Sequence, residues 1–152
     1  MRNTISSWGL RVALGLLSAG FIYTGIDNAF GGVMTLGWQG LRDFAQITDP
    51  VQFAVRDSHV RFLGGVYTLI GGAVALSAIQ LRRFHDLLRL ALIAAFVGGL
   101  ARFSQLDLSV TFGPGVLVPL VVELVGRPLL YLWAGSVLRE RAAAPAAVAP
   151  VS

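Results

Sequence analysis

The sequence contains no cysteine and no lysine, and only 13% of its 152 residues are charged. Without cysteine, the chain has no disulfides, no thiolate nucleophile and no cysteine-ligated metal site. Without lysine, it has no Schiff-base chemistry. Soluble domains carry about 25% charged residues, whereas 55% of this chain is hydrophobic. A chain this short and this apolar is typical of one domain whose solvent is lipid.

The charge that is present comes from twelve arginines against eight acidic residues, which gives a net charge of +4. The arginines flank apolar segments and do not form a basic patch with aromatic residues, so no nucleic-acid partner is expected. The sequence also lacks the Walker, Rossmann, metalloprotease and nucleophile-elbow patterns. We therefore expect no cofactor and no metal site.

The dominant positive feature is a set of apolar segments long enough to cross a bilayer. A helix rises about 1.5 Å per residue, so about 20 residues span the roughly 30 Å hydrocarbon core. The first segment has no clear signal-peptidase site after it and is expected to be retained. Together the segments predict an all-α, integral membrane four-helix bundle over residues 1–138, followed by a disordered Ala/Pro-rich tail at 139–152. The predicted spans are residues 8–29, 60–80, 87–103 and 115–138.

The orientation follows from the short loop LRRFHDLLR, which contains Arg82, Arg83 and Arg89. Short loops rich in arginine remain on the cytoplasmic side. This predicts a multi-pass protein of the cytoplasmic membrane with both termini in the cytoplasm.

The loop between the first two spans carries two further signals. Trp38, Leu41 and Ala45 recur at helical spacing, which predicts a short helix in the outer membrane interface. Asp49 followed by Pro50 is typical of an N-cap and the first helical position. The second helix is therefore expected to begin near Pro50, outside the membrane.

Glycine doublets mark three places along the second and third spans. Small residues let transmembrane helices approach closely, which matters because lipid provides no hydrophobic drive between helices. Two of the doublets are seven residues apart and share one side of the second helix. The glycines predicted to pack against neighbouring helices are Gly64, Gly65, Gly71, Gly72, Gly98 and Gly99.

The segment VVELVGRPLL places Glu123 and Arg127 within the fourth span. An isolated carboxylate in hydrocarbon is costly, so Glu123 is expected to be paired. Arg61 begins the second span and Arg102 ends the third, and their long stems can reach inward to bind the carboxylate through two parallel hydrogen bonds. Arg127 lies one helical turn from Glu123, and Asp27 is a further candidate counter-ion. Pro128, in the same segment, is expected to kink the fourth helix.

Three stretches, RDSHVRFLGGVYTLIGG, FVGGLARF and VVELVGRPLL, resemble the small bacterial membrane protein family catalogued as domain of unknown function 4345. The resemblance covers residues 10–138 and implies four helices in a bacterial inner membrane, but no activity. His59 departs from the acidic residue that the family pattern implies, and Arg127 is an addition to that pattern. The positions that match are Arg61, Gly64, Gly65, Gly98, Gly99, Leu100, Arg102 and Glu123.

Three classes of function remain open, and the sequence does not establish whether the chain is an enzyme. We favour a structural or accessory membrane protein in which the arginine–glutamate cluster locks the helices together, because buried ion pairs often specify packing. The alternative is a binding site for the head group of an anionic lipid, a quinone or an isoprenoid. A small membrane enzyme would instead use Glu123, and more weakly His59, to exchange protons with a lipid-soluble substrate. The expected partners are membrane lipid, a lipid-soluble small molecule, and further copies of the chain or a larger membrane complex.

Overall fold

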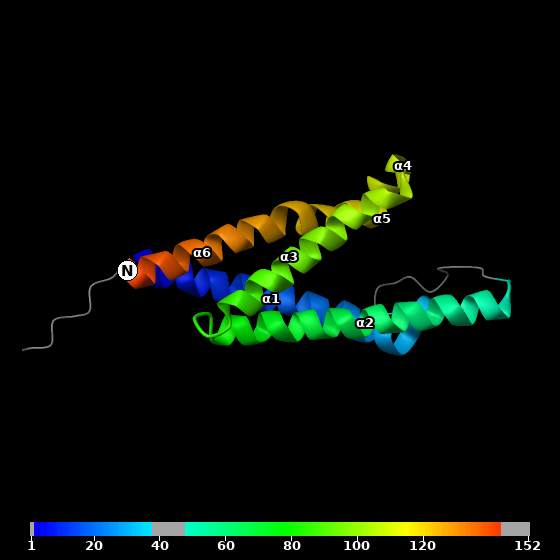
Figure 1. The fold of residues 1–152 in the computed structure, drawn as a ribbon, viewed down its shortest axis with the longest axis horizontal. Coiled ribbons are helices and arrows are strands. Elements are labelled where there is room, and N and C mark those ends of the chain that lie inside the picture. The colour runs from blue at the N-terminus through cyan, green and yellow to red at the C-terminus, as the bar shows by residue number, and fades with distance from the viewer. Residues whose placement is uncertain (1, 38–47, 144–152) are drawn as a thin grey trace, which may run out of the picture. The chain divides into compact units, whose positions relative to one another are not determined.

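The computed structural model describes residues 2–37 and 48–143, and every regular element in these ranges is helical (Figure 1). Large apolar side chains such as Phe62 and Leu69 are 70% and 75% exposed, as expected for surfaces that face lipid. The predicted all-α fold with four potential spans is confirmed. The helices long and apolar enough to cross a membrane cover Ser6–Met34, Pro50–Ile79, His85–Ser104 and Pro114–Glu140.

Internal contacts divide the chain into two compact units. Unit 2 is Val12–Leu81, and unit 1 consists of Met1–Arg11 together with Arg82–Ser152. The first helix, α1 (Arg2–Gly31), contributes residues to both units.

Unit 2 pairs most of α1 with α2 (Pro50–Ile79), and the turn η1 (Gly32–Met34) follows α1. The start of α2 has the predicted cap. The Asp49 carboxylate accepts hydrogen bonds from the backbone N–H groups of Val51 and Gln52, at 2.8 and 3.2 Å. Proline at the first helical position has no N–H to leave unsatisfied, so the Asp-Pro pair fixes this helix start.

The backbones of α1 and α2 are in direct contact at glycines. A Cβ added at Gly64 would lie 2.7 Å both from Ala29 Cα and from the Gly25 carbonyl oxygen. Further along, the Ser18 hydroxyl donates to the Gly71 carbonyl at 2.8 Å. In each α2 doublet the first glycine makes the close approach. Among the described residues, nothing lies within 4 Å of a Cβ added at the second glycine, Gly65 or Gly72.

Unit 1 is built around α3 (His85–Ala101), which packs against two segments of the fourth span, η3 (Val122–Gly126) and α6 (Arg127–Ala143). Its buried apolar side chains include Leu88, Leu92, Ala134 and Val137. The elements between α3 and η3 are η2 (Arg102–Gln105), α4 (Leu108–Thr111) and α5 (Pro114–Val121).

The fourth span is interrupted by a π-helical turn rather than by a simple proline kink. In η3 the backbone N–H of Arg127 donates to the carbonyl of Val122, five residues earlier. Pro128 has no N–H, and in a regular helix its ring would clash with the carbonyl four residues before it. The wider turn directly before Pro128 relieves that crowding, and such π-bulges occur frequently at functional sites.

Two predicted segments lie wholly or partly outside the residues that the structure describes. The interfacial helix expected around Trp38, Leu41 and Ala45 lies outside the described residues. α6 continues through residues 139–143, which the composition assigns to the tail. The stretch LRERAAA consists of strong helix formers, which accounts for the extension. Residues 144–152 lie outside the described residues.

Candidate functional site

A buried ion pair joins the end of α3 to the π turn of the fourth span. Arg102 Nε lies 2.6 Å from Glu123 Oε2, and Arg102 Nη2 lies 2.9 Å from Oε1. The carboxylate therefore accepts two parallel hydrogen bonds, the strongest arrangement available to an arginine and a carboxylate. Glu123 is only 6% exposed. The predicted pairing of these two residues is confirmed.

Local sequence explains why the two side chains meet. Arg102 is the first residue after α3, and Glu123 lies in the first turn of η3. A Cβ added at Gly99 would lie 2.7 Å from Glu123 Cβ, whereas one added at Gly98 would have no described neighbour within 4 Å. Only a glycine at position 99 lets α3 approach η3 this closely.

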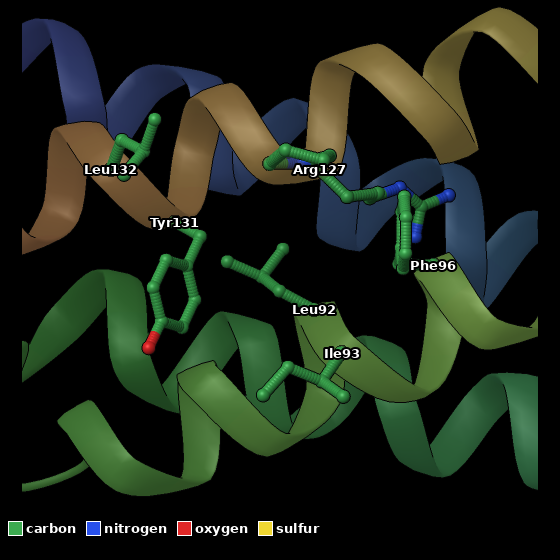
Figure 2. Close-up of a pocket in the computed structure, with 7 residues that line it drawn as sticks. Leu92, Ile93, Phe96, Arg127, Tyr131 and Leu132 are labelled. Carbon is green, nitrogen blue, oxygen red and sulfur yellow. The ribbon is translucent and has the colours of Figure 1, made fainter.

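Beside the ion pair, α3 and α6 enclose a groove of about 330 Å³. Figure 2 shows Arg127 and Phe96 together at one end, while Tyr131 extends from α6 toward α3. We call this the α3–α6 groove. It is lined by Leu92, Ile93 and Phe96 from α3, and by Arg127, Pro128, Tyr131 and Leu132 from α6.

Arg127 gives the groove its charge. Its side chain lines the groove, and the residue is 6% exposed. Of the seven residues that line the groove, Arg127 is the one with a charged side chain. The predicted pairing of Glu123 with Arg127 stays a prediction.

In unit 2, Arg61 binds the end of α1. Its Nε lies 2.6 Å from Asp57 Oδ2, and its Nη1 donates to the Phe30 carbonyl at 2.7 Å. Asp57 also accepts a hydrogen bond from the Val33 N–H at 2.9 Å. Arginine commonly satisfies the last carbonyls of a helix in this way. The role of Asp57 was not predicted from the sequence, although its position four residues before Arg61 on one helix was a usable signal.

The other predicted site residues of unit 2 have separate surroundings. Asp27 is fully buried and accepts a hydrogen bond from the Leu36 N–H at 2.7 Å. His59 is exposed on α2. The convergence of Asp27 and Arg61 with Arg102 and Glu123 stays a prediction, because these residues belong to different units.

Comparison with known families gives one result. A family model described as a domain of unknown function (DUF4345) matches residues 9–134. The chain belongs to this family. No curated protein and no solved structure matches it. The match to DUF4345 includes both members of the ion pair and all seven residues that line the α3–α6 groove, of which Tyr131 and Leu132 lie near its end.

In the part of the chain that the structure describes, the acidic and imidazole groups do not gather into a metal centre. Within residues 2–37 and 48–143, no group of three His, Cys, Asp or Glu side chains could hold a metal ion. The site therefore consists of one ion pair, one further arginine and an apolar groove.

Between the third and fourth spans, Asp107 caps the start of α4. The hydrogen bonds of this cap make its contribution to stability depend on pH. The Ser109 hydroxyl donates a hydrogen bond to the Asp107 carboxylate and has the largest effect on its pKa; the Val110 N–H donates a second one. Both hydrogen bonds lower the pKa of Asp107 below the usual 3.8. The cap therefore contributes stability that is fully present above pH 3.8 and is lost as the pH falls through the lower, folded-state pKa. A ¹³C NMR titration of the Asp107 carboxyl should give a midpoint below 3.8, and Ser109→Ala should raise it. A wild-type midpoint at or above 3.8 would contradict the cap.

Proposed function

We propose that this chain is an accessory membrane protein that binds a single-chain anionic amphiphile in the α3–α6 groove. The observation that supports this most strongly is the groove itself, which has six apolar or aromatic residues and one arginine in its lining. In this proposal the apolar wall holds the chain of the ligand and Arg127 binds its head group. The Arg102–Glu123 pair has a structural role and holds the groove in shape.

The size and charge of the groove suit such a ligand. Its volume of about 330 Å³ lies within the range of small-molecule sites. Charged residues are costly in hydrocarbon and therefore rare within membrane segments, and those that occur usually mark a functional site. A guanidinium binds a carboxylate head group through paired hydrogen bonds.

The geometry of Glu123 favours the structural role over a catalytic one. A general acid or base needs an oxygen within hydrogen-bond reach of its substrate. Both Glu123 oxygens accept from Arg102, and the residue is buried where η3 packs against α3. The ion pair instead ties together the two elements that continue into the groove walls.

We also propose a cellular setting for this binding activity. The protein would span a bacterial cytoplasmic membrane with both termini in the cytoplasm. The support is the arginine-rich turn between α2 and α3, because such turns remain on the cytoplasmic side.

Photolabelling in phosphatidylcholine nanodiscs tests the binding site. The probe is palmitate with a diazirine in its chain, used at alkaline pH so that its head is a carboxylate. Labelled peptides should map to α3 and α6, and Arg127→Leu should lower the labelling about tenfold, the value of a lost charge-assisted hydrogen bond. Hexadecanol with the same diazirine should label weakly, because it offers no anion to Arg127.

The matched control is Arg56→Leu, which removes an exposed arginine of α2 and should leave the labelling unchanged. Equal labelling by the alcohol, undiminished labelling of Arg127→Leu, or labels confined to α1 and α2 would each contradict the proposed site. Circular dichroism of each variant confirms that the helices remain folded.

A further inference from the structure

A second and larger cavity lies at the other end of the α3–α6 pair, where α3 begins. Its volume is about 620 Å³. We call it the basic cavity because three of the six residues that line it are arginines. These residues are Arg82, His85, Arg89, Gly135, Leu138 and Arg139.

The arginines reach this cavity from three separate elements. Arg82 lies in the turn before α3, Arg89 lies on α3, and Arg139 lies on α6. The preference of arginine for the cytoplasmic side of a membrane explains why arginines lie at this end of the helices. It does not explain why three of them line the same cavity. Arg83 shows the difference, because it lies over the Phe84 ring at 5.4 Å and does not line the cavity.

Asp86, next to the lining residue His85, neutralises only part of the charge of this cavity. Asp86 Oδ1 lies 3.0 Å from His85 Nε2 and 3.9 Å from Arg89 Nη1, and the Asp86 side chain is 80% exposed. Of the three arginines that line the cavity, only Arg89 has a carboxylate oxygen within 4 Å among the described residues. Like charges around one cavity repel each other and concentrate anions there.

The local geometry also holds donors in place for an anion. The Arg89 guanidinium lies 5.6 Å from the Tyr131 ring centroid, which limits its freedom. No side chain of the described residues caps the start of α3, so the positive end of the helix dipole adds to the field of the arginines. Arginine forks match the oxygens of a phosphate group.

We propose that the basic cavity binds a phosphate group that carries net negative charge, either on the head of an anionic phospholipid or as free phosphate. A span begins at His85, so the cavity lies at the depth of the lipid head groups. The site shares no lining residue with the α3–α6 groove. The two proposals can therefore be tested separately, and the failure of one does not contradict the other.

The first arm of the test uses nanodiscs with equal amounts of phosphatidylglycerol and phosphatidylcholine, followed by native mass spectrometry of the retained lipid. The wild type should retain phosphatidylglycerol at least about tenfold over phosphatidylcholine. Arg139→Gln should lower this preference about fivefold, the attraction of one basic side chain for an anionic head group. Asp86→Asn should raise it by a similar factor, because its carboxylate competes with the phosphate.

The second arm measures thermal unfolding in dodecyl maltoside, with inorganic phosphate or chloride at equal ionic strength. If the natural ligand is soluble, phosphate raises the midpoint of the wild type and not of Arg139→Gln, while phosphatidylglycerol is not retained. Retained phosphatidylglycerol identifies the lipid as the source.

Arg83→Gln is the matched control from the same turn and should behave as the wild type in both arms. The opposite shifts expected for Arg139→Gln and Asp86→Asn cannot both result from misfolding. The proposal is overturned if neither arm detects a phosphate effect, or if Arg83→Gln lowers the preference as much as Arg139→Gln.

Discussion

Arg102→Ala should lower the free energy of unfolding by about 3–5 kcal/mol, the usual cost of breaking a buried ion pair by removing one partner. The substitution leaves the Glu123 carboxylate, at 6% exposure, without the guanidinium that donates two hydrogen bonds to it. The loss is large because neither lipid nor protein solvates the remaining charge. Unfolding by SDS in mixed micelles, followed by circular dichroism, measures the difference.

The control for this prediction replaces both partners with apolar residues. Arg102→Met combined with Glu123→Leu should unfold close to the wild type, since apolar replacement of a buried pair is often neutral or stabilising. The single variants Arg102→Met and Glu123→Leu complete a double-mutant cycle with this double variant. An exposed ion pair would give a coupling free energy several times smaller than the one expected here. A double variant as unstable as Arg102→Ala would contradict this reason for the loss. It would show that α3 and η3 are held together by the ion pair itself, and that the single variant is not unstable because of its unpaired carboxylate.

The second large effect is expected at the contact between α1 and α2. Gly64→Ala should lower the free energy of unfolding by about 3 kcal/mol, at the upper end of the cost of overpacking. Its new Cβ would meet backbone atoms, Ala29 Cα and the Gly25 carbonyl oxygen, each at 2.7 Å. Backbone cannot move aside as the end of a flexible side chain can, so the helices must separate.

The neighbouring glycine provides a matched control for this contact. Gly65→Ala places the same methyl group where no described atom lies within 4 Å. It should leave the stability unchanged or raise it by about 1 kcal/mol, because alanine favours the helix more than glycine does. Equal losses from both substitutions would mean that the α1–α2 contact does not depend on Gly64.

The features that could be predicted from the sequence depend on spacing along one helix or on the cost of a charge in lipid. Segment length and apolar content predicted four spans, and the Asp49-Pro50 pair predicted the start of α2. The Arg102–Glu123 pair followed from the need to neutralise a carboxylate within a span. Each of these inferences uses a strong, local physical constraint.

The features that could not be predicted depend on which apolar surfaces face each other. Groove-lining residues such as Leu92 and Phe96 are of the same apolar types as the residues that face lipid, so no sequence pattern distinguishes the two groups. Glycine doublets indicated close packing, but only the backbone geometry shows that Gly64 makes a close approach and Gly65 does not. Pro128 predicted a disturbance of the fourth helix, although not that a π turn would precede it.

The central claim is that the fourth span divides its charges between a structural pair and a binding arginine. The most direct measurement is the photolabelling of α3 and α6 by diazirine palmitate in the Arg102→Met, Glu123→Leu double variant, compared with Arg127→Leu. The account predicts that the double variant, if folded, keeps wild-type labelling while Arg127→Leu loses it. A folded double variant without labelling, or a fully labelled Arg127→Leu, would contradict it.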